Sequence, residues 1–347
     1  MAKKKTTIHD IAKKLDTTAS TVSRALRDHP RISKSTKKAV WKMAKKLDYQ
    51  PNNIAAALRK GKSNIIGVLV PTSDRHFFAS VIRGIEEGIN KAGYNIIICQ
   101  SDDLPSKEQS NIEALLKIQV DGIIASIAKD TTDFSHYERI IKRGTPLILY
   151  DRVREDLQVN TVTSNDYLGA FKAVEHLIEQ GCTNIAHFSG QQHVMIYQER
   201  LRGYKDALKK HQLPINEKWI LEADLIDETA TVLQTGRRLT QQLLEMDNLP
   251  DGIFSSNDFA AMGAIQVLKE QNIAIPEEVA LVGFSNDIST SFIEPALSTV
   301  DQFTKQMGNF AAQLFLEQVN TDDETPYTPR KTVLNPELIV RASSLRR

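Results

Sequence analysis

A short run of hydroxyl residues that ends in an arginine contains side chains well suited to chemistry. Residues 18–24 read Thr-Ala-Ser-Thr-Val-Ser-Arg. A guanidinium such as that of Arg24 can donate two hydrogen bonds to a guanine edge, whereas serine and threonine hydroxyls bond bases or phosphates. If the run is helical, Val22 faces inward and the polar side chains face outward. The predicted chemistry is hydrogen bonding to a nucleic acid.

The charge distribution along the chain favours the same interpretation. The 347 residues contain 44 Lys and Arg and 43 Asp and Glu, a formal net charge of +1. Residues 1–62 alone carry 17 basic and 4 acidic side chains, a balance of +13, which leaves −12 for residues 63–347. Such asymmetry is typical of a module for nucleic acid or an anionic surface joined to a second unit.

Three short amphipathic helices are expected to position the polar run. Apolar residues recur at helical spacing within residues 8–15, 22–26 and 39–47. Ser33 or Ser35 can begin the third helix. Three such helices bury little apolar area, so we expect this unit to be marginally stable alone. A lysine-rich bundle with a solvated face is the alternative interpretation.

The turn between the first two helices meets the requirements of a helix-turn-helix. Ala12 is small enough for the helices to approach closely, and Val22 anchors the second helix against the first. Asp16 takes the turn position that needs positive φ, where glycine is usual. Thr18 can cap the second helix. Together with the charge of +13, this spacing favours a DNA-reading unit over the alternative.

A short linker follows the basic unit. Pro51 and Gly61 bracket a stretch of small residues with one leucine, Leu58, before Arg59 and Lys60. A helix of this length is not expected to be stable unaided. An apolar side chain beside basic residues suits a wedge in the DNA minor groove. An ordinary connector is the alternative.

Strand-like and helical runs alternate from Asn64 onward. This alternation predicts parallel sheets covered by helices. Roughly ten strands are more than a single domain usually contains, so we expect two α/β lobes. Strand-like runs lie at residues 65–70, 95–99, 122–127, 146–150, 184–189, 252–255 and 279–284.

Polar and aromatic residues follow several of these strands. The carboxyl ends of parallel strands share one edge of a sheet, and a cleft between two lobes is a natural small-molecule site. Taken singly, an aspartate there is more often a helix cap, and a phenylalanine is as often a core residue. Their convergence predicts the site. The candidates are Phe77, Phe78, Ser126, Asp151, Arg200, Asp258, Ser285 and Asp287.

Other function classes lack the residues they require. No phosphate-cradling glycine motif, HExxH, GxSxG or Cys/His cluster is present, so we predict no enzyme, catalytic residue, metal or cofactor. The longest apolar runs, such as residues 65–70, are far below the ~18 residues that span a bilayer, and no apolar segment follows the N-terminal lysines. Cys99 and Cys182 form no disulfide framework. We expect a protein of the reduced cytoplasm with no membrane partner.

Several motifs resemble the lactose/galactose-repressor (LacI/GalR) family, and the similarity extends over essentially the whole chain. The resemblance implies an α/β protein with an N-terminal all-α helix-turn-helix headpiece (1–50), a hinge helix (51–62) and a two-lobed, periplasmic-binding-protein-like core of parallel sheets (63–347). The first lobe would comprise about residues 63–162 and 300–327, and the second about 163–299 and 328–342. The motifs are Thr7–Ala12, Thr21–Leu26, Asp48–Asn52, Ala280–Phe284 and Pro295–Val300.

The resemblance also implies partners and roles. The family members are homodimeric transcription regulators, whose headpieces read the half-sites of a pseudo-palindromic double-stranded operator and whose paired hinge helices kink its minor groove. Ala19, Ser20 and Arg24 would read bases, and Thr18, Thr21 and Ser23 would contact phosphates. Leu58 would be the wedge, with Ala55 beside it on the same helix face. The effector contacts would be Phe77, Ser126, Arg200, Asp258 and the turn from Ser285 to Asp287, with Asp151 as a further candidate.

The sequence departs from the family pattern at two places. Ser285 replaces the usual aspartate after the Gly-Phe pair. Where a purine-sensing relative would place a stacking phenylalanine, this chain reads Ala-Asp-Leu at residues 223–225. We therefore expect a sugar or sugar derivative as effector, because carboxylates, amides and arginines with few aromatic rings suit many hydroxyls. A protein partner or a non-sugar ligand such as a nucleoside is the alternative, and Arg200 could equally bind a carboxylate or phosphate.

Overall fold

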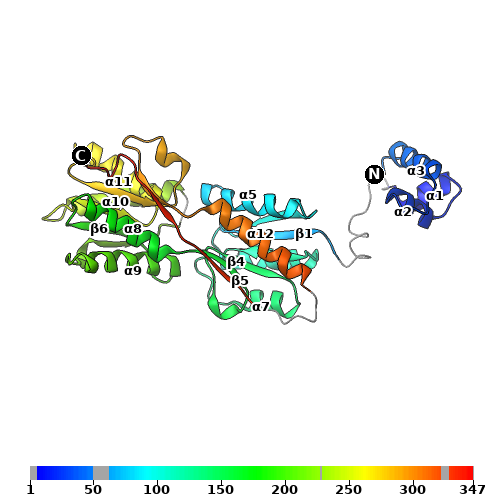
Figure 1. Cartoon of the computed structure of the whole chain (residues 1–347), viewed down its shortest axis with the longest axis horizontal. Helices are drawn as coiled ribbons and strands as arrows, with labels where there is room; N and C mark the ends of the chain where they lie inside the picture. Colours follow the sequence, from blue (N-terminus) through cyan, green and yellow to red (C-terminus); the bar gives the residue numbers. More distant parts are fainter. Residues whose placement is uncertain (1–5, 50–61, 227–228, 322–327, 347) are drawn as a thin grey trace. The chain divides into compact units, whose positions relative to one another are not determined.

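The computed structural model describes residues 6–49, 62–226, 229–321 and 328–346. The chain divides into two compact units, Met1–Ser63 and Asn64–Arg347, and each is described here by itself (Figure 1). None of the described helices is long and apolar enough to cross a membrane.

The first unit is a bundle of three helices, α1 (Ile8–Lys14), α2 (Ala19–Leu26) and α3 (Lys34–Lys46). Each helix begins at a hydroxyl residue whose side chain accepts a backbone N–H of the first turn, which satisfies one of the donors left free there. The apolar stripes meet at the centre, so the predicted all-helical headpiece is confirmed. Its buried side chains are Ile11, Ala12, Val22, Ala25, Val40 and Ala44.

The second unit contains two lobes, each built on a six-stranded sheet. The sheet of the first lobe is parallel throughout and has the order β11-β5-β4-β3-β1-β2. Its central strands are apolar on both faces, as expected for a sheet covered on both sides. The strands are β1 (Ile65–Val70), β2 (Asn95–Gln100), β3 (Gly122–Ala125), β4 (Leu147–Tyr150), β5 (Asn160–Ser164) and β11 (Lys331–Leu334).

Helices cover both faces of this first sheet. α5 (His76–Asn90) and α12 (Thr304–Asn320) pack side by side on one face, as Figure 1 shows. Their backbones approach so closely that a Cβ on Gly84 would lie 2.1 Å from the Lys305 carbonyl oxygen. α6 (Pro105–Lys117) and α7 (Ser135–Lys142) bury Leu115 and Ile140 in the other core of the lobe.

The second lobe repeats this architecture with the strand order β12-β10-β9-β8-β6-β7, in which only β12 is antiparallel to its neighbour. α8 (Asp166–Glu179) and α9 (Met195–Lys210) pack together, as do α10 (Thr229–Leu244) and α11 (Asp258–Glu270). The expected two-lobed core of parallel sheets is thereby confirmed. The strands are β6 (Ile185–Gly190), β7 (Ile220–Ala223), β8 (Gly252–Ser255), β9 (Ala280–Phe284), β10 (Ser298–Asp301) and β12 (Glu337–Ile339).

The chain crosses between the lobes three times, after β5, after β10 and between β11 and β12. The predicted lobe boundary at residue 328 is wrong by one strand, because residues 331–334 form β11 beside β5 in the first sheet. β11 is a short edge strand with an exposed Val333, so its sequence does not indicate which sheet it joins. In Figure 1 the C-terminal segment, in red, runs across both lobes.

Candidate functional site

The reading helix α2 is built around two local features. Asp16 has a φ of 46°, so it occupies the left-handed turn position expected of it. Thr18 begins the helix, and its Oγ1 accepts the N–H of Thr21 at 3.1 Å. Val22 is buried, while Ser20 and Arg24 are exposed. The bundle therefore presents a hydroxyl and a guanidinium on the outer face of α2.

Three of the other predicted DNA contacts, Ala19, Thr21 and Ser23, are less exposed to solvent than Ser20 and Arg24. Ala19 is half-buried and packs against the headpiece core, and the Thr21 hydroxyl lies 3.0 Å from that of Thr18 in a hydrogen bond. Ser23 is half-buried. Ala55 and Leu58 lie outside the described residues.

A cleft of about 640 Å³, part of it open to solvent, lies between the two lobes of the core. It is lined by loops and helices that follow β1 and β4 in the first lobe and β6, β7, β8, β9 and β10 in the second. Seven of the eight predicted effector residues line it: Phe77, Phe78, Asp151, Arg200, Asp258, Ser285 and Asp287.

Ser126 is the predicted residue that does not line the cleft. It follows β3 directly, as expected, but it is fully buried. Its hydroxyl has no hydrogen-bond partner among the described residues. The position at a strand end was correct, whereas the direction of the side chain could not be read from the sequence.

Arg200 lies at the base of the cleft, on α9. It is 4% exposed and donates to Asp166 through Nε at 2.8 Å, with a second guanidinium nitrogen 2.6 Å from the same carboxylate. A third nitrogen donates to the carbonyl oxygen of Ser256 at 2.7 Å, and the guanidinium stacks 3.8 Å from the centre of the Phe284 ring. Burial raises the pKa of Asp166 and Arg200 opposes that rise. Arg200 is therefore an anchored arginine whose donors are largely occupied.

Asp151 and Arg152 form a second charged pair on the wall of the cleft. Arg152 donates to Asp103 at 2.6 Å and lies 3.9 Å from the Asp151 carboxylate. Asp151 has a φ of 57° and is buried. Burial raises the pKa of Asp151 to about 6, although Arg152 favours its charged form. This carboxyl can change protonation near neutral pH.

Asp258 organises the opposite wall. It begins α11 and accepts hydrogen bonds from the Thr299 hydroxyl at 2.6 Å and from the backbone N–H of Asp287 at 2.8 Å. Burial raises the pKa of Asp258 to about 7, and both hydrogen bonds oppose the rise. Asp287 in turn caps the next turn by accepting the N–H of Ser289 at 2.9 Å. The carboxyl of Asp258 thus fixes the turn from Ser285 to Asp287 against the cleft.

Orphaned polar atoms gather at this edge of the sheets. Buried polar groups normally have hydrogen-bond partners, so unpartnered ones require an explanation. Within the described residues, six buried side-chain atoms have no partner, and His187 Nε2 is the one of these that lies in the middle of a strand. The five that lie at or beyond strand ends are Arg75 Nε, Ser126 Oγ, Ser164 Oγ, Ser256 Oγ and Gln302 Nε2.

Eight residues that line the cleft are not among the predicted effector contacts. Some signals were available: Tyr197 lies about one helical turn before Arg200, and Gln302 directly follows β10. The expectation of few aromatic rings is wrong, since Tyr197 and Phe259 line the cleft with Phe77 and Phe78. The missed residues are Arg75, Arg152, Ile196, Tyr197, Ile226, Asn257, Phe259 and Gln302.

In the parts of the chain that the structure describes, no group of three or more His, Cys, Asp or Glu side chains is arranged to hold a metal ion. Arg200 and Arg152 are instead paired with Asp166 and Asp103, and Asp258 accepts hydrogen bonds from neutral donors. Its chemistry is that of a binding site with hydrogen-bond donors, acceptors and aromatic surface.

Known proteins match the chain in both units. Residues 7–52 match the profile described as bacterial regulatory proteins, lacI family, and residues 174–344 match the periplasmic binding protein-like domain. The transcriptional repressor PurR of Actinobacillus pleuropneumoniae serotype 3 (strain JL03) is 30% identical over 97% of this chain and 98% of its own. The ribose operon repressor of Halalkalibacterium halodurans is 31% identical over 98% of this chain and 97% of its own.

A solved structure shares the fold. The crystal structure of the lac repressor dimer bound to operator and the anti-inducer ONPF has a TM-score of 0.84 and 22% identity, and covers 99% of this chain and 100% of that one. The full-length identity to the repressors, the helix-turn-helix and the two-lobed core agree. The chain belongs to the lacI family of bacterial regulatory proteins, which are DNA-binding transcription regulators with an effector-binding core and not enzymes.

Proposed function

We propose that this regulator is a repressor whose affinity for a double-stranded, pseudo-palindromic operator is controlled by a sugar or sugar derivative bound between the lobes. The proposed ligand class rests on one observation, the pairing of two arginines of the cleft with carboxylates of the protein. Arg200 and Arg152 are each held by a carboxylate of the protein, Asp166 and Asp103. An anionic ligand that bound either of these two arginines would have to displace its carboxylate partner, which is costly.

A neutral ligand rich in hydroxyl groups fits the remaining polar atoms. Gln302 Nε2 is a buried donor without a partner in the described structure, and Gln302 lines the cleft. Asp151 and Asp258 supply acceptors on opposite walls when ionised. A sugar hydroxyl both donates and accepts, so it can pair with either kind of group.

A nucleoside is the second candidate, and the aromatic lining favours it. Phe77, Phe78, Tyr197 and Phe259 offer ring faces on which a base or the apolar face of a sugar ring can pack. One matched relative is a ribose operon repressor and another is the repressor named PurR, so similarity alone does not choose between the classes.

A thermal-shift screen of neutral sugars, sugar phosphates and nucleosides tests the ligand class. A ligand that binds only the folded core raises the unfolding temperature, because the stabilisation grows as the logarithm of its concentration relative to Kd. We expect a neutral sugar to do so and its phosphate to do less. Gln302→Ala should reduce the shift, whereas Asn309→Ala, in the groove between α5 and α12, should not. A nucleoside response would replace the sugar by the second candidate, and a core stabilised by a protein alone would contradict both.

For the DNA, we propose that Ser20 and Arg24 read bases with a smaller share from Ala19, while Thr18, Thr21 and Ser23 position α2 on phosphates. The hinge at residues 51–62 would insert Leu58 into the minor groove, with Ala55 allowing close approach. Leu58→Ala should weaken specific binding far more than non-specific binding, as measured by competition between operator and random-sequence DNA. Equal losses would argue against the wedge.

We propose that the working form is a homodimer, because each headpiece reads one half-site. Two apolar side chains near the cleft support an interface, since Ile288 is 59% exposed and Phe292 is 80% exposed. Effector binding would change the angle between the lobes and thus the spacing of the two hinges. DNA must then alter effector affinity by the same factor. Sedimentation of Phe292→Asp, compared with Asp247→Ala on the surface, would reveal whether this region joins the subunits.

A further inference from the structure

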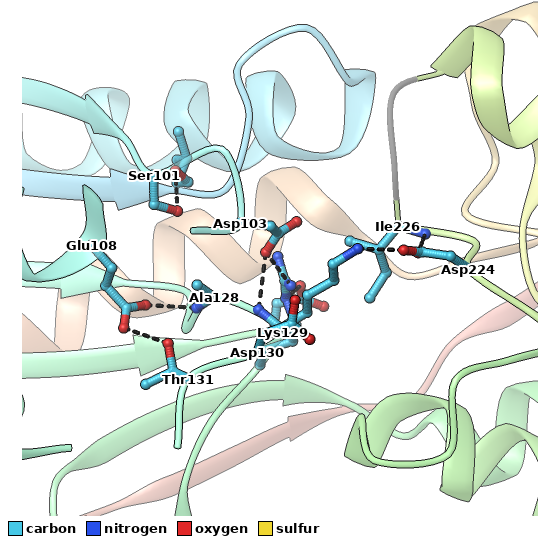
Figure 2. Close-up of polar contacts among 12 residues, drawn as sticks. Ser101, Asp103, Glu108, Ala128, Lys129, Asp130, Thr131, Asp224 and Ile226 are labelled. Atoms are coloured by element: carbon cyan, nitrogen blue, oxygen red, sulfur yellow. Dashed lines mark hydrogen bonds and ion pairs between the residues drawn. The ribbon is translucent and has the colours of Figure 1, made fainter. Parts of the chain in front are cut away.

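Two loops, one from each lobe, meet beside the cleft. The loop after β3 carries Lys129, whose Nζ bonds the carboxylate of Asp224 after β7 in the other lobe. The Lys129 side chain is only 15% exposed and that of Asp224 is 34% exposed. Next to them, Nε2 of His193 lies 3.1 Å from the Asp130 carboxylate, which is also a contact between lobes. Figure 2 shows the Lys129 amine extended toward Asp224.

The loop that carries Lys129 is held firmly from beneath. Glu108 on α6 is fully buried and accepts the backbone N–H of Ala128 at 2.6 Å and the Thr131 hydroxyl at 2.7 Å (Figure 2). The same carboxyl group is bonded to His136 and Tyr137, each at 2.9 Å. Both neighbours of the Lys129–Asp130 pair are thus fixed to the first lobe, which lowers the entropy cost of presenting these two side chains.

Both ends of the ion pair also connect to the wall of the cleft. On the first lobe, Asp103 accepts the N–H of Lys129 at 3.1 Å and the guanidinium of Arg152 at 2.6 Å. On the second lobe, Asp224 accepts the N–H of Ile226 at 2.9 Å, and the Ile226 carbonyl accepts a hydrogen bond from Arg75. Arg152, Ile226 and Arg75 line the cleft.

We propose that Lys129 and Asp224 form a latch that holds the two lobes together beside the cleft, and that breaking it shifts the core toward an open form. In the open form both charges are hydrated, so the pair contributes only the difference between its attraction and the cost of desolvation. A lobe equilibrium that depends on such a pair is expected to shift by about tenfold when one charge is removed. The proposal concerns the lobe equilibrium and does not depend on which effector the protein binds.

The test measures the distance between lobes in the full-length chain. Spin labels are placed at Ser110→Cys on α6 and Gln241→Cys on α10, both exposed, with Cys99→Ser removing the more accessible native thiol. Lys129→Met and Asp224→Asn each keep most of the side-chain volume. The control is Lys205→Met, because Lys205 pairs with Glu217 at 2.9 Å within the second lobe.

Pulsed dipolar measurements should show about a tenfold rise in the ratio of long to short distances in each latch variant and no change in the control. Lys129→Asp should open the lobes at least as far, and adding Asp224→Lys should restore the short distance. Unchanged distances in the single variants, or failure of the exchanged pair to restore closure in a chain with native unfolding temperature, would overturn the latch. Because no ligand or DNA is added, this result is independent of the effector screen.

Discussion

The headpiece and the core present their chemistry in opposite ways. On α2, Arg24 is exposed and the buried side chains beside it are apolar. In the core, Arg200 is 4% exposed and is held by Asp166 and the Ser256 carbonyl. In the headpiece, the residues proposed to contact DNA are therefore different from those that stabilise the bundle. In the core, a residue of the cleft also stabilises its lobe. The same kind of substitution should have different consequences in the two units.

Salt concentration should affect DNA binding by the headpiece much more than ligand binding by the core. If six to ten phosphates are neutralised, raising salt from about 50 to 200 mM should weaken DNA binding by about 10³–10⁵-fold, because condensed counterions are no longer released as favourably. Fluorescence anisotropy with a labelled DNA fragment measures this effect. Ligand binding in the core should change little, since its charges are paired and partly buried. A flat dependence for DNA would contradict the proposed role of the headpiece.

Removing Arg200 should destabilise the core. Arg200→Ala leaves the Asp166 carboxylate buried without its partner, and such a loss costs about 3–5 kcal/mol. Urea unfolding followed by circular dichroism measures the change. Arg202→Ala is the matched control, because that arginine is 56% exposed and its ion pair with Glu199 should contribute under about 1 kcal/mol. Equal stabilities of the two variants would show that Arg200 is not an anchor.

Removing Arg24 should affect recognition and leave folding unchanged. Arg24→Ala should weaken operator binding by about 1–3 kcal/mol if the guanidinium reads a base. Arg27→Ala, at the exposed C-cap of the same helix, should lower specific and non-specific affinity alike. Parallel titrations with operator and random DNA distinguish the two effects. Equal behaviour of both variants would remove Arg24 from base reading.

The pH dependence of core stability should depend on Asp258. Because the pKa of Asp258 is raised to about 7 in the folded protein, the native state holds more protons than the unfolded state from about pH 4 to 7. Stability from this group therefore falls as the pH rises through that window. Asp258→Asn should flatten the fall by up to about 4 kcal/mol in unfolding experiments, because each unit of pKa shift corresponds to about 1.4 kcal/mol. The exposed Asp247→Asn is the control, and an unchanged slope in Asp258→Asn would contradict the assignment.

Much of the fold was predictable because it depends on local periodicity. The headpiece helices, the left-handed turn at Asp16 and the alternation of strands and helices all follow from spacing along the chain. The ends of parallel strands share one edge of a sheet, and seven of the residues predicted on that ground line one cleft. What failed depended on distant partners: the pairing of β11 with β5, and the bonds between Arg200 and Asp166. Local sequence does not record such long-range contacts.

The late position of β11 and β12 affects how the chain folds during synthesis. The headpiece is complete after α3, and its contacts are local. Each sheet of the core instead is complete only when a strand after residue 330 has been synthesised, because β11 completes the first sheet and β12 the second. A chain interrupted before that point would carry a DNA-reading unit beside two unfinished sheets with open edges, which favour aggregation and degradation. We therefore expect fragments that bind DNA but cannot be regulated to be short-lived.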